Sequence, residues 1–240
     1  MNQYIKTGYI IMKHHRDQLL LENCRVTDHS LHIISHIALE YPEKEIFLRL
    51  GGHLAKTVLM PEQEQHLRCI ARKAFDQCEL QGRYGIFAID SVQDDAVILS
   101  CGEEIRSESF ARKCKGLTHL WCGAVTAGKK VTGIRDSLDS VADRAVWDAV
   151  GGESADAAMD FIHRNACREL LRKGMNLSSW RYSPGFGDMT LEVQKFFYRC
   201  LRMAEMNIVL TEHCFMLPEK SVTAFAGITL LQGNFDYDSK

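Results

Sequence analysis

The sequence predicts an α+β fold built on a mostly antiparallel, twisted sheet with flanking helices. Its 240 residues, 46% of them hydrophobic and 25% charged, are enough for one large domain with a substantial core. Helical stripes and short β-rich runs both occur, but they do not alternate strictly along the chain, as they would in a doubly wound parallel sheet. We therefore expect neighbouring antiparallel strands with helices packed against them.

The first hundred residues (1–100) are expected to form an N-terminal α/β lobe, with a boundary near residue 100. Thr27 is a candidate cap for a helix over residues 27–39 that stops before Pro42. A second helix opens at Pro61 and carries an apolar stripe to Cys78, and Gly82 lies beyond its end. Residues 84–89 and 96–99 are predicted to be strands joined by a turn at residues 93–95.

The remaining residues, 101–240, are expected to form the core of the molecule. A strand is predicted at residues 118–126, followed by helices over residues 138–149 and 155–170. The pair Gly151-Gly152 is expected to end the first of these helices, and Gly174 the second. A further helix over residues 193–204 precedes strands at residues 208–210 and 222–228, and the polar tail at residues 232–240 is expected to fray.

Charge and cysteine usage exclude several classes of protein. The formal net charge is -2 and no long basic run occurs, which argues against a nucleic-acid partner. None of the nine cysteines forms a CxxC pair, and several fall on apolar positions of predicted helices, as free thiols do in a reducing compartment. The apolar run at residues 9–12 is too short for a signal-peptide core or a membrane span. We expect a cytoplasmic protein with no membrane contact.

Two patterns are weak candidates for binding sites. Residues 123–129 nearly match a phosphate-binding loop, but Lys130 stands where the motif needs a hydroxyl to hold magnesium, so a strand-to-helix turn lining another pocket is the better interpretation. His29, His32 and His36 would share one helical face and could bind zinc, yet no carboxylate or cysteine completes the ligand set. We therefore predict no metal site. Nucleophile-elbow and dinucleotide-binding motifs are absent from the sequence.

The most informative segment is the loop at residues 181–188, Arg-Tyr-Ser-Pro-Gly-Phe-Gly-Asp, followed by Leu-Thr-Glu at residues 210–212 and Pro-Glu-Lys-Ser-Val at residues 218–222. Two glycines permit tight backbone turns, and Pro184 fixes its own φ. Arg181 could clamp a carboxylate, while Asp188 and Glu212 could face a positive centre. Such a loop would suit a ligand that carries both an amino-acid carboxylate and a sulfonium. The alternative is a structural turn with a solvated arginine.

These segments, together with Met216, resemble the S-adenosylmethionine-binding activation domain of vitamin B12-dependent methionine synthase. In that family an Arg-x-x-Pro-Gly-Tyr loop contacts the ligand, and Leu-Thr-Glu and Pro-x-x-Ser-Val segments follow in the same order. The resemblance covers about residues 116–228 and is most specific over residues 181–222. The chain looks more like the stand-alone, activation-domain-like proteins of bacteria than like the C-terminal module of a full synthase.

The resemblance implies a C-shaped α+β domain that binds S-adenosylmethionine (AdoMet) at its inner edge. The domain would present the methyl group to cobalamin, vitamin B12, held by a partner methyltransferase protein. An electron from flavodoxin or a ferredoxin-like donor would be coupled to methyl transfer onto oxidised cobalamin, which reactivates the partner. The chemistry would belong mostly to the cofactors, and the protein would supply position and electrostatics.

The same resemblance implies a set of AdoMet-binding residues in the loop and just beyond it. Arg181 would hold the carboxylate of the ligand, and the loop backbone would offer further contacts. A charged wall would stand opposite. The implied residues are Arg181, Tyr182, Ser183, Pro184, Gly185, Phe186, Asp188 and Glu212. No catalytic residue is assigned.

Three departures from the family pattern leave the function open. Phe186 stands where the family has tyrosine, so any role of that hydroxyl is lost or taken by Tyr182. The pair of tyrosines that follows the final strand of full-length synthases is not visible, and the Asp-x-His-x-x-Gly cobalamin signature is absent. We expect a reactivation subunit, a component of a methyltransferase system in methionine biosynthesis. A non-catalytic AdoMet-binding or corrinoid-chaperone module, and an interaction module with a purely structural loop, remain alternatives.

Overall fold

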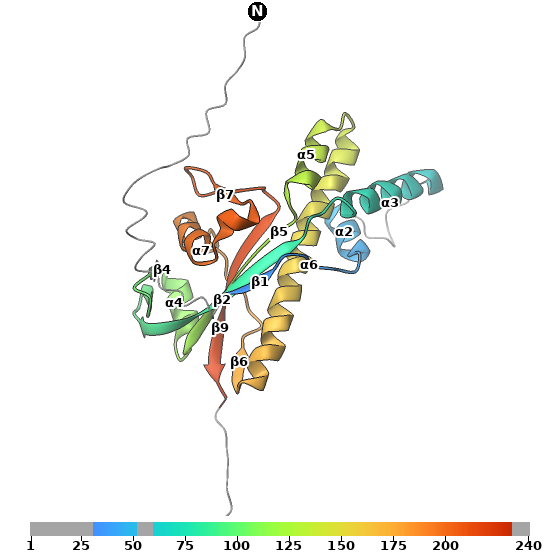
Figure 1. Cartoon of the computed structure of the whole chain (residues 1–240). Helices are drawn as coiled ribbons and strands as arrows, with labels where there is room; N and C mark the ends of the chain where they lie inside the picture. Colours follow the sequence, from blue (N-terminus) through green and yellow to red (C-terminus); the bar gives the residue numbers. More distant parts are fainter. Residues whose placement is uncertain (1–30, 52–59, 232–240) are drawn as a thin grey trace, which may run out of the picture.

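The structure, a computed structural model, describes residues 31–51 and 60–231 of the chain. Its strands are β1 (His32–Ile34), β2 (Gln81–Val92), β3 (Ala96–Leu99), β4 (Glu104–Arg106), β5 (His119–Thr126), β6 (Met175–Leu177), β7 (Val209–Leu210), β8 (Met216–Leu217) and β9 (Ser221–Leu230). The main sheet has the order β4-β3-β2-β5-β9-β6, with β1 beside β2, while β7 and β8 form a separate hairpin (Figure 1). All of these pairs are antiparallel.

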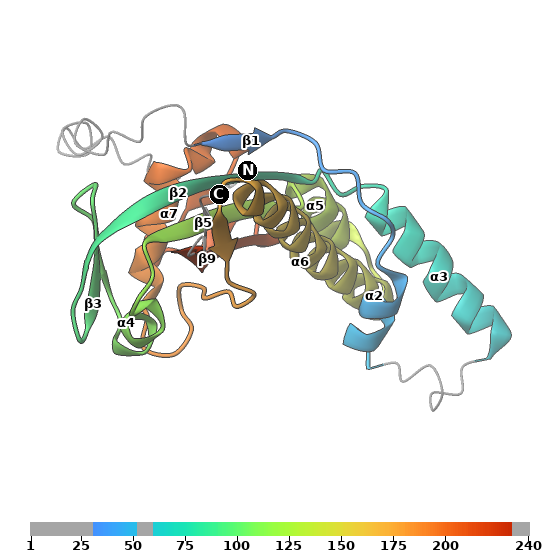
Figure 2. The ribbon, with the colours of Figure 1, turned by 90° about the horizontal axis from the view of Figure 1, so that it is seen from below.

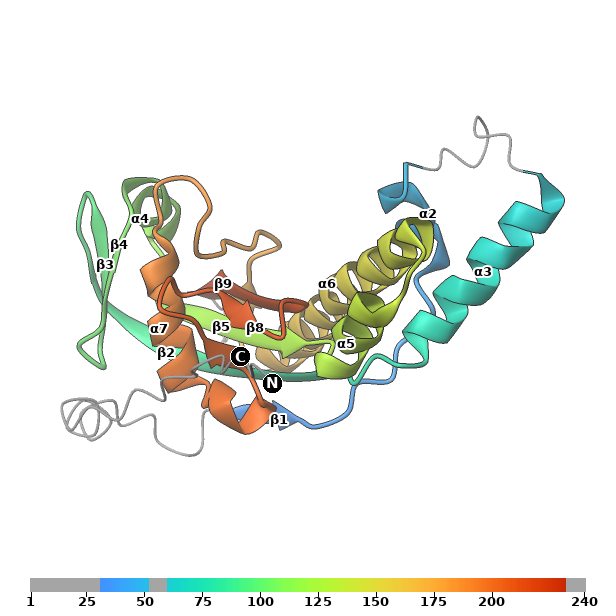
Figure 3. The ribbon, with the colours of Figure 1, turned by 90° about the horizontal axis from the view of Figure 1, so that it is seen from above.

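The helices cover both faces of this sheet. They are α2 (Glu43–Arg49), α3 (Pro61–Phe75), α4 (Glu108–Cys114), α5 (Lys129–Ser137), α6 (Val141–Arg172) and α7 (Gln194–Cys200), with short 3-10 turns at Leu191–Val193 and Met203–Met206. In Figure 3, α4 lies with β3 and β4 at one end of the sheet, and α2, α3, α5 and α6 lie at the other. Figure 2 shows the same bend from below, so the molecule is C-shaped.

The central strand β5 explains why two separate cores form. Alternate side chains of a strand point to opposite faces of the sheet. Trp121 and Val125 therefore join the core under α3 and α6, while Leu120 and Cys122 join the core under α4 and α7. A strand that is apolar on both faces must be covered on both, as a solvated face would leave one set of these side chains in water. The predicted α+β class with a mostly antiparallel sheet is confirmed.

The two halves of the sequence share one sheet. Strand β2, before residue 100, pairs with β5, after it, from Gln81 opposite Thr126 to Ala88 opposite His119. Whether residues 1–100 and 101–240 form separate lobes stays a prediction.

The helix predicted over residues 27–39 is wrong where the structure describes it. His32–Ile34 is the strand β1, paired with Gly82–Tyr84 of β2, and residues 27–30 lie outside the described part. The His32 ring stacks on Tyr84 at a centroid distance of 4.3 Å, and Ile37 is buried against the sheet core. β-branched isoleucines pack well on a pleated surface, so the helix-like spacing of Leu31 and Ile34 was misleading.

The predicted break at Gly151-Gly152 is also wrong. Helix α6, which is 32 residues long, runs through both glycines without interruption. The glycines make room for two long cations. A Cβ on Gly151 would come within 2.9 Å of Cγ of Lys220, and one on Gly152 within 2.5 Å of Nη1 of Arg49. Packing of distant segments against the helix thus outweighs the low helix propensity of glycine, about 1 kcal/mol per residue.

The other predicted elements are confirmed with shifted limits. The helix from Pro61 ends earlier, at Phe75, and Gly174 follows the end of α6 with a positive φ of 71°. The helix predicted over residues 193–204 stops at Cys200, because Arg202 adopts a left-handed φ of 50°. The short elements β1, β4, β6, β8, α2 and α4 were not predicted, since so few residues show no clear period. The tail at residues 232–240 lies outside the described residues.

Candidate functional site

The loop that carries Arg181 is anchored along the edge of β9. Its backbone forms two hydrogen bonds with Phe225: the Tyr182 amide donates to the Phe225 carbonyl at 2.9 Å, and the Phe225 amide donates back at 2.8 Å. Upstream, the Ser178 amide donates to the Gly227 carbonyl at 2.8 Å. This part of the loop therefore behaves as an extra extended segment beside the sheet, with side chains that alternate between its faces.

Because of this alternation, Arg181 and Tyr182 face opposite ways. Tyr182 is buried in the core under α4, with its ring 5.2 Å from that of Phe110 and its hydroxyl hydrogen-bonded to Ser109. The Arg181 guanidinium points to the other face and donates from Nη1 to Asp160 on α6. The arginine is thus held at the α6 side of the sheet edge.

The following residues make a tight turn, as the sequence predicts. The Ser183 carbonyl accepts a hydrogen bond from the Phe186 amide at 3.1 Å, and Pro184 is buried. Gly185 and Gly187 have positive φ values of 85° and 60°, which are strained for other residues. The turn leaves the Phe186 side chain 67% exposed at its tip.

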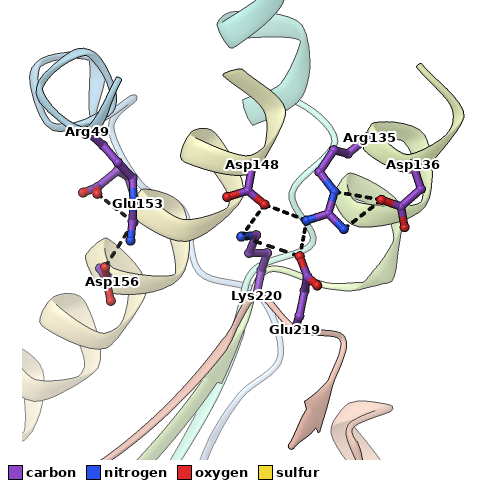
Figure 4. A network of polar contacts seen from close by, with 8 residues as sticks. All are labelled: Arg49, Arg135, Asp136, Asp148, Glu153, Asp156, Glu219 and Lys220. Atoms are coloured by element: carbon purple, nitrogen blue, oxygen red, sulfur yellow. Dashed lines mark hydrogen bonds and ion pairs between the residues drawn. The ribbon is translucent and has the colours of Figure 1, made fainter. Parts of the chain in front are cut away.

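Arg181 belongs to a cluster of charged groups on α6. The Arg181 cluster, as we define it, also contains Arg49 at the end of α2. Arg49 pairs with Glu153 at 2.8 Å and lies 3.7 Å from Asp156. Asp156 and Asp160 are one helical turn apart and therefore share one side of α6. Figure 4 shows one end of this cluster. Its members are Arg49, Glu153, Asp156, Asp160, His163 and Arg181.

Two titratable groups in the cluster are perturbed. Partial burial, followed by the nearby charge of Arg181, lowers the pKa of His163, whose Nε2 lies 3.0 Å from the Ser178 carbonyl oxygen. Desolvation raises the pKa of Asp156; Arg49 and Arg181 oppose this shift, and Asp160 reinforces it. The pKa of Asp156 rises although two arginines are close, which indicates that their positive charge does not fully offset the cost of desolvating this carboxylate.

Asp188 faces α4 rather than Arg181. Its carboxylate accepts hydrogen bonds from the hydroxyls of Ser107 and Ser109 and from the backbone amides of Glu108 and Ser109. These contacts lower the pKa of Asp188, the Ser109 hydroxyl most strongly. They also satisfy free amides at the first turn of α4, where a negative charge is favourable. Asp188 is explained without a ligand, and a ligand-binding role for it stays a prediction.

Glu212 lies in the exposed turn between β7 and β8. Within the described residues it forms no hydrogen bond or ion pair with Arg181 or Asp188, so the structure does not join the three charged groups of the loop hypothesis. Near the same hairpin is a hollow of about 340 Å³. We refer to it as the hairpin hollow, and its lining residues are Leu191, Gln194, Cys214, Phe215, Met216, Leu217 and Glu219.

The hairpin hollow and the Arg181 cluster are separate places. Gln194 is buried, and its side-chain oxygen accepts from Thr223, which faces α7. At the rim, Glu219 pairs with Arg135, which also pairs with Asp148 at 2.6 Å (Figure 4). Asp148 precedes Asp160 by twelve residues on α6, about 18 Å at 1.5 Å per residue. One small ligand therefore does not fill both.

The two weaker candidates find structural explanations. Within residues 123–129, Ala127 and Gly128 form the turn from β5 into α5, as favoured from the sequence. Both of their amides are already used: Ala127 donates to the Lys220 carbonyl and Gly128 to Oγ1 of Thr126. His32 lies on a strand rather than a helix, and His29 lies outside the described residues. Across residues 31–51 and 60–231, no group of three or more potential ligands is placed to hold a metal ion.

Asp156 and Asp160 were missed from the sequence. Their signal was present, because two carboxylates four residues apart within a helical pattern share a face. The sequence alone does not show which way the Arg181 side chain points, because this orientation depends on the pairing of Tyr182 with Phe225.

The fold and the charged edge define an α+β protein with a curved antiparallel sheet. No protein-family model and no curated protein sequence matches the chain. It is similar to a solved structure described as the crystal structure of the MetH reactivation domain bound to AdoHcy, with a TM-score of 0.53 and 16% sequence identity. The similarity covers 80% of this chain and 70% of that chain. At this identity it shows a shared fold, as the sequence resemblance predicted.

Two observations bear on the environment of the protein. In the part of the chain that the structure describes, no helix combines the length and apolar character needed to cross a bilayer. Six of the cysteines described there are free thiols: Cys69, Cys78, Cys114, Cys122, Cys167 and Cys214. The reducing, cytoplasmic location stays a prediction.

Proposed function

We propose that this chain binds AdoMet at the Arg181 cluster and serves as a reactivation subunit for a cobalamin-dependent methyltransferase. The observation that carries the proposal is the position of Arg181, which the edge of β9 holds against two carboxylates of α6. The fold supports it, because a reactivation domain of the same fold has been solved with AdoHcy, the demethylated product of AdoMet.

The charges of the cluster fit the amino-acid end of AdoMet. A guanidinium has five N–H donors, and Arg181 uses Nη1 for Asp160, so donors remain for a ligand carboxylate. Asp156 and Asp160 offer negative charge for the ammonium and sulfonium groups. Ser183 and Gly185 stand next in the loop, with Gly185 able to bring its backbone close to a ligand. Arg181 would bind and orient the carboxylate, and the two aspartates would hold the cationic groups.

When bound, AdoMet supplies a methyl group that cobalamin on a partner protein accepts, with an electron from flavodoxin or a ferredoxin-like donor. The contribution of this chain would be to position the ligand and to dock on the partner. A cytoplasmic location would suit these partners. In this proposal the chain acts as a separate subunit of a methionine synthase-type system.

A non-catalytic binding or chaperone role is the second candidate, and one observation favours it. Phe186, at the exposed tip of the loop, has no hydroxyl. Tyr182 does not replace it, because its own hydroxyl is buried against Ser109. If the chemistry needs a tyrosine hydroxyl at the tip of the loop near the cobalt, this loop provides none, and only binding would remain.

Calorimetric titration of the purified chain with AdoMet tests the binding proposal, and saturable one-to-one binding is expected. No heat of binding at millimolar AdoMet would rule out both candidates and leave the loop a structural turn. To separate the two, the chain is mixed with a cobalamin-loaded methyltransferase and a low-potential reductant. AdoMet-dependent formation of methylcobalamin supports the reactivation role. AdoMet binding without methylcobalamin formation supports the second candidate, and so does the appearance of methylcobalamin when Phe186→Tyr replaces the wild type.

A further inference from the structure

The Arg181 cluster has more negative than positive charge. Its cations are Arg49 and Arg181, and its anions are Glu153, Asp156 and Asp160, which leaves a formal charge of -1 with His163 neutral. Arg164, one turn further along α6, forms no ion pair with Asp160 within the described residues and is not counted as a member of the cluster.

The surplus charge is best assigned to Asp156. Glu153 has a close partner in Arg49, and Asp160 has one in Arg181. Among the described residues Asp156 has only the 3.7 Å contact with Arg49, which is too long for a hydrogen bond. Its side chain is 55% exposed, so it is accessible to a ligand. Desolvation raises the pKa of Asp156, and the charge of Asp160 adds to this shift while Arg49 and Arg181 oppose it.

A carboxylate in this position discriminates between ligands by charge. AdoMet has a net charge of +1, from one carboxylate, one ammonium and one sulfonium. AdoHcy has lost the methyl group and the sulfonium charge, and its net charge is zero. The two molecules otherwise share the same amino-acid and nucleoside parts, so a site of net negative charge binds the first more tightly than the second.

We propose that Asp156 makes the Arg181 cluster selective for the sulfonium of AdoMet over the thioether of AdoHcy. This inference rests on the proposed function and adds to it: the site favours the methyl donor and weakens its hold on the demethylated product. Asp156 is a specificity-determining residue here, distinct from Arg181, which holds the carboxylate common to both ligands.

The expected effect is moderate because the site is partly exposed. Unit charges about 5 Å apart in a largely aqueous environment change an affinity by roughly fivefold. The test is calorimetric titration of the whole chain with AdoMet and with AdoHcy, for wild type and for Asp156→Asn. The quantity compared is the ratio of the two dissociation constants. Asp156→Glu retains the charge, and Asp94→Asn, a fully exposed aspartate in the β2–β3 turn, is the matched control.

We expect wild type, Asp156→Glu and Asp94→Asn to prefer AdoMet. Asp156→Asn should lose about fivefold of this preference, with weaker AdoMet binding and unchanged or tighter AdoHcy binding. Thermal melting checks that each variant is folded. Equal affinities of the wild type for both ligands, or an equal loss for both in Asp156→Asn, would overturn this inference while the proposed function stands. Failure of the wild type to bind either ligand would overturn the proposed function, and the inference with it.

Discussion

The replacement Arg181→Ala separates a binding arginine from a structural one. In the free protein the Arg181 side chain is 32% exposed and its partner Asp160 is 55% exposed. Ion pairs this exposed contribute about 0.2–1 kcal/mol to folding. The loop itself is anchored by backbone bonds of Tyr182, which the replacement leaves in place. We therefore expect the melting temperature to fall by no more than about 4 °C, the shift that 1 kcal/mol causes in a chain of this size.

The expected loss in AdoMet binding is much larger. A charge-assisted hydrogen bond contributes about 1.5–3 kcal/mol, which corresponds to a dissociation constant raised about 10- to 150-fold. Arg181→Lys keeps the charge but not the two-pronged geometry, and should give an intermediate value. The control is Arg168→Ala, an exposed arginine two turns past Asp160 on α6. Calorimetry measures all three. An Arg181→Ala protein that binds AdoMet as tightly as the control would refute the role given to Arg181.

Three further predictions concern stability. Hydrogen bonds to α4 lower the pKa of Asp188 in the folded protein. The stability that these bonds contribute is therefore fully present above the unfolded-state pKa of about 3.9 and is lost progressively as the pH falls from there toward the folded-state pKa. Asp188→Asn should thus lower the melting temperature at pH 7 more than at pH 3, and an equal difference at both pH values would contradict this account. A Cβ at Gly123 would overlap the fully buried Trp121 ring, and Gly123→Ala should cost about 1–3 kcal/mol in denaturant unfolding. Gly152→Ala displaces only the flexible end of Arg49 and gains about 1 kcal/mol of helix propensity. The free energy of unfolding of this variant should therefore equal or exceed that of the wild type. A loss as large as that of Gly123→Ala would show that Arg49 is more firmly held than its exposure suggests.

The sequence predicted the long strands well, because their composition reflects their burial. β5 and β9 are mostly apolar, and both are buried on two faces along most of their length. The errors arose where distant residues decide the local structure. Gly151 and Gly152 look like a helix stop, but Lys220 and Arg49 pack against them and the helix continues.

The candidate site was predicted in part for the same reason. Arg181 and the two-glycine turn were identified, and the structure places both in one ordered loop. Asp188 is seven residues from Arg181 in the sequence and was expected to stand opposite it. Pairing with Phe225 turns the loop so that Arg181 faces α6 and Asp188 faces α4. Local sequence does not encode this separation, because it depends on the register of the loop against β9.

The most direct test of the account is a crystal structure of the chain with AdoMet or AdoHcy bound. We predict that the ligand carboxylate lies within hydrogen-bonding distance of the Arg181 guanidinium, about 2.7–3.2 Å, with its cationic groups toward Asp156 and Asp160. A ligand bound elsewhere, for example in the hairpin hollow, with the Arg181–Asp160 pair unchanged would contradict it.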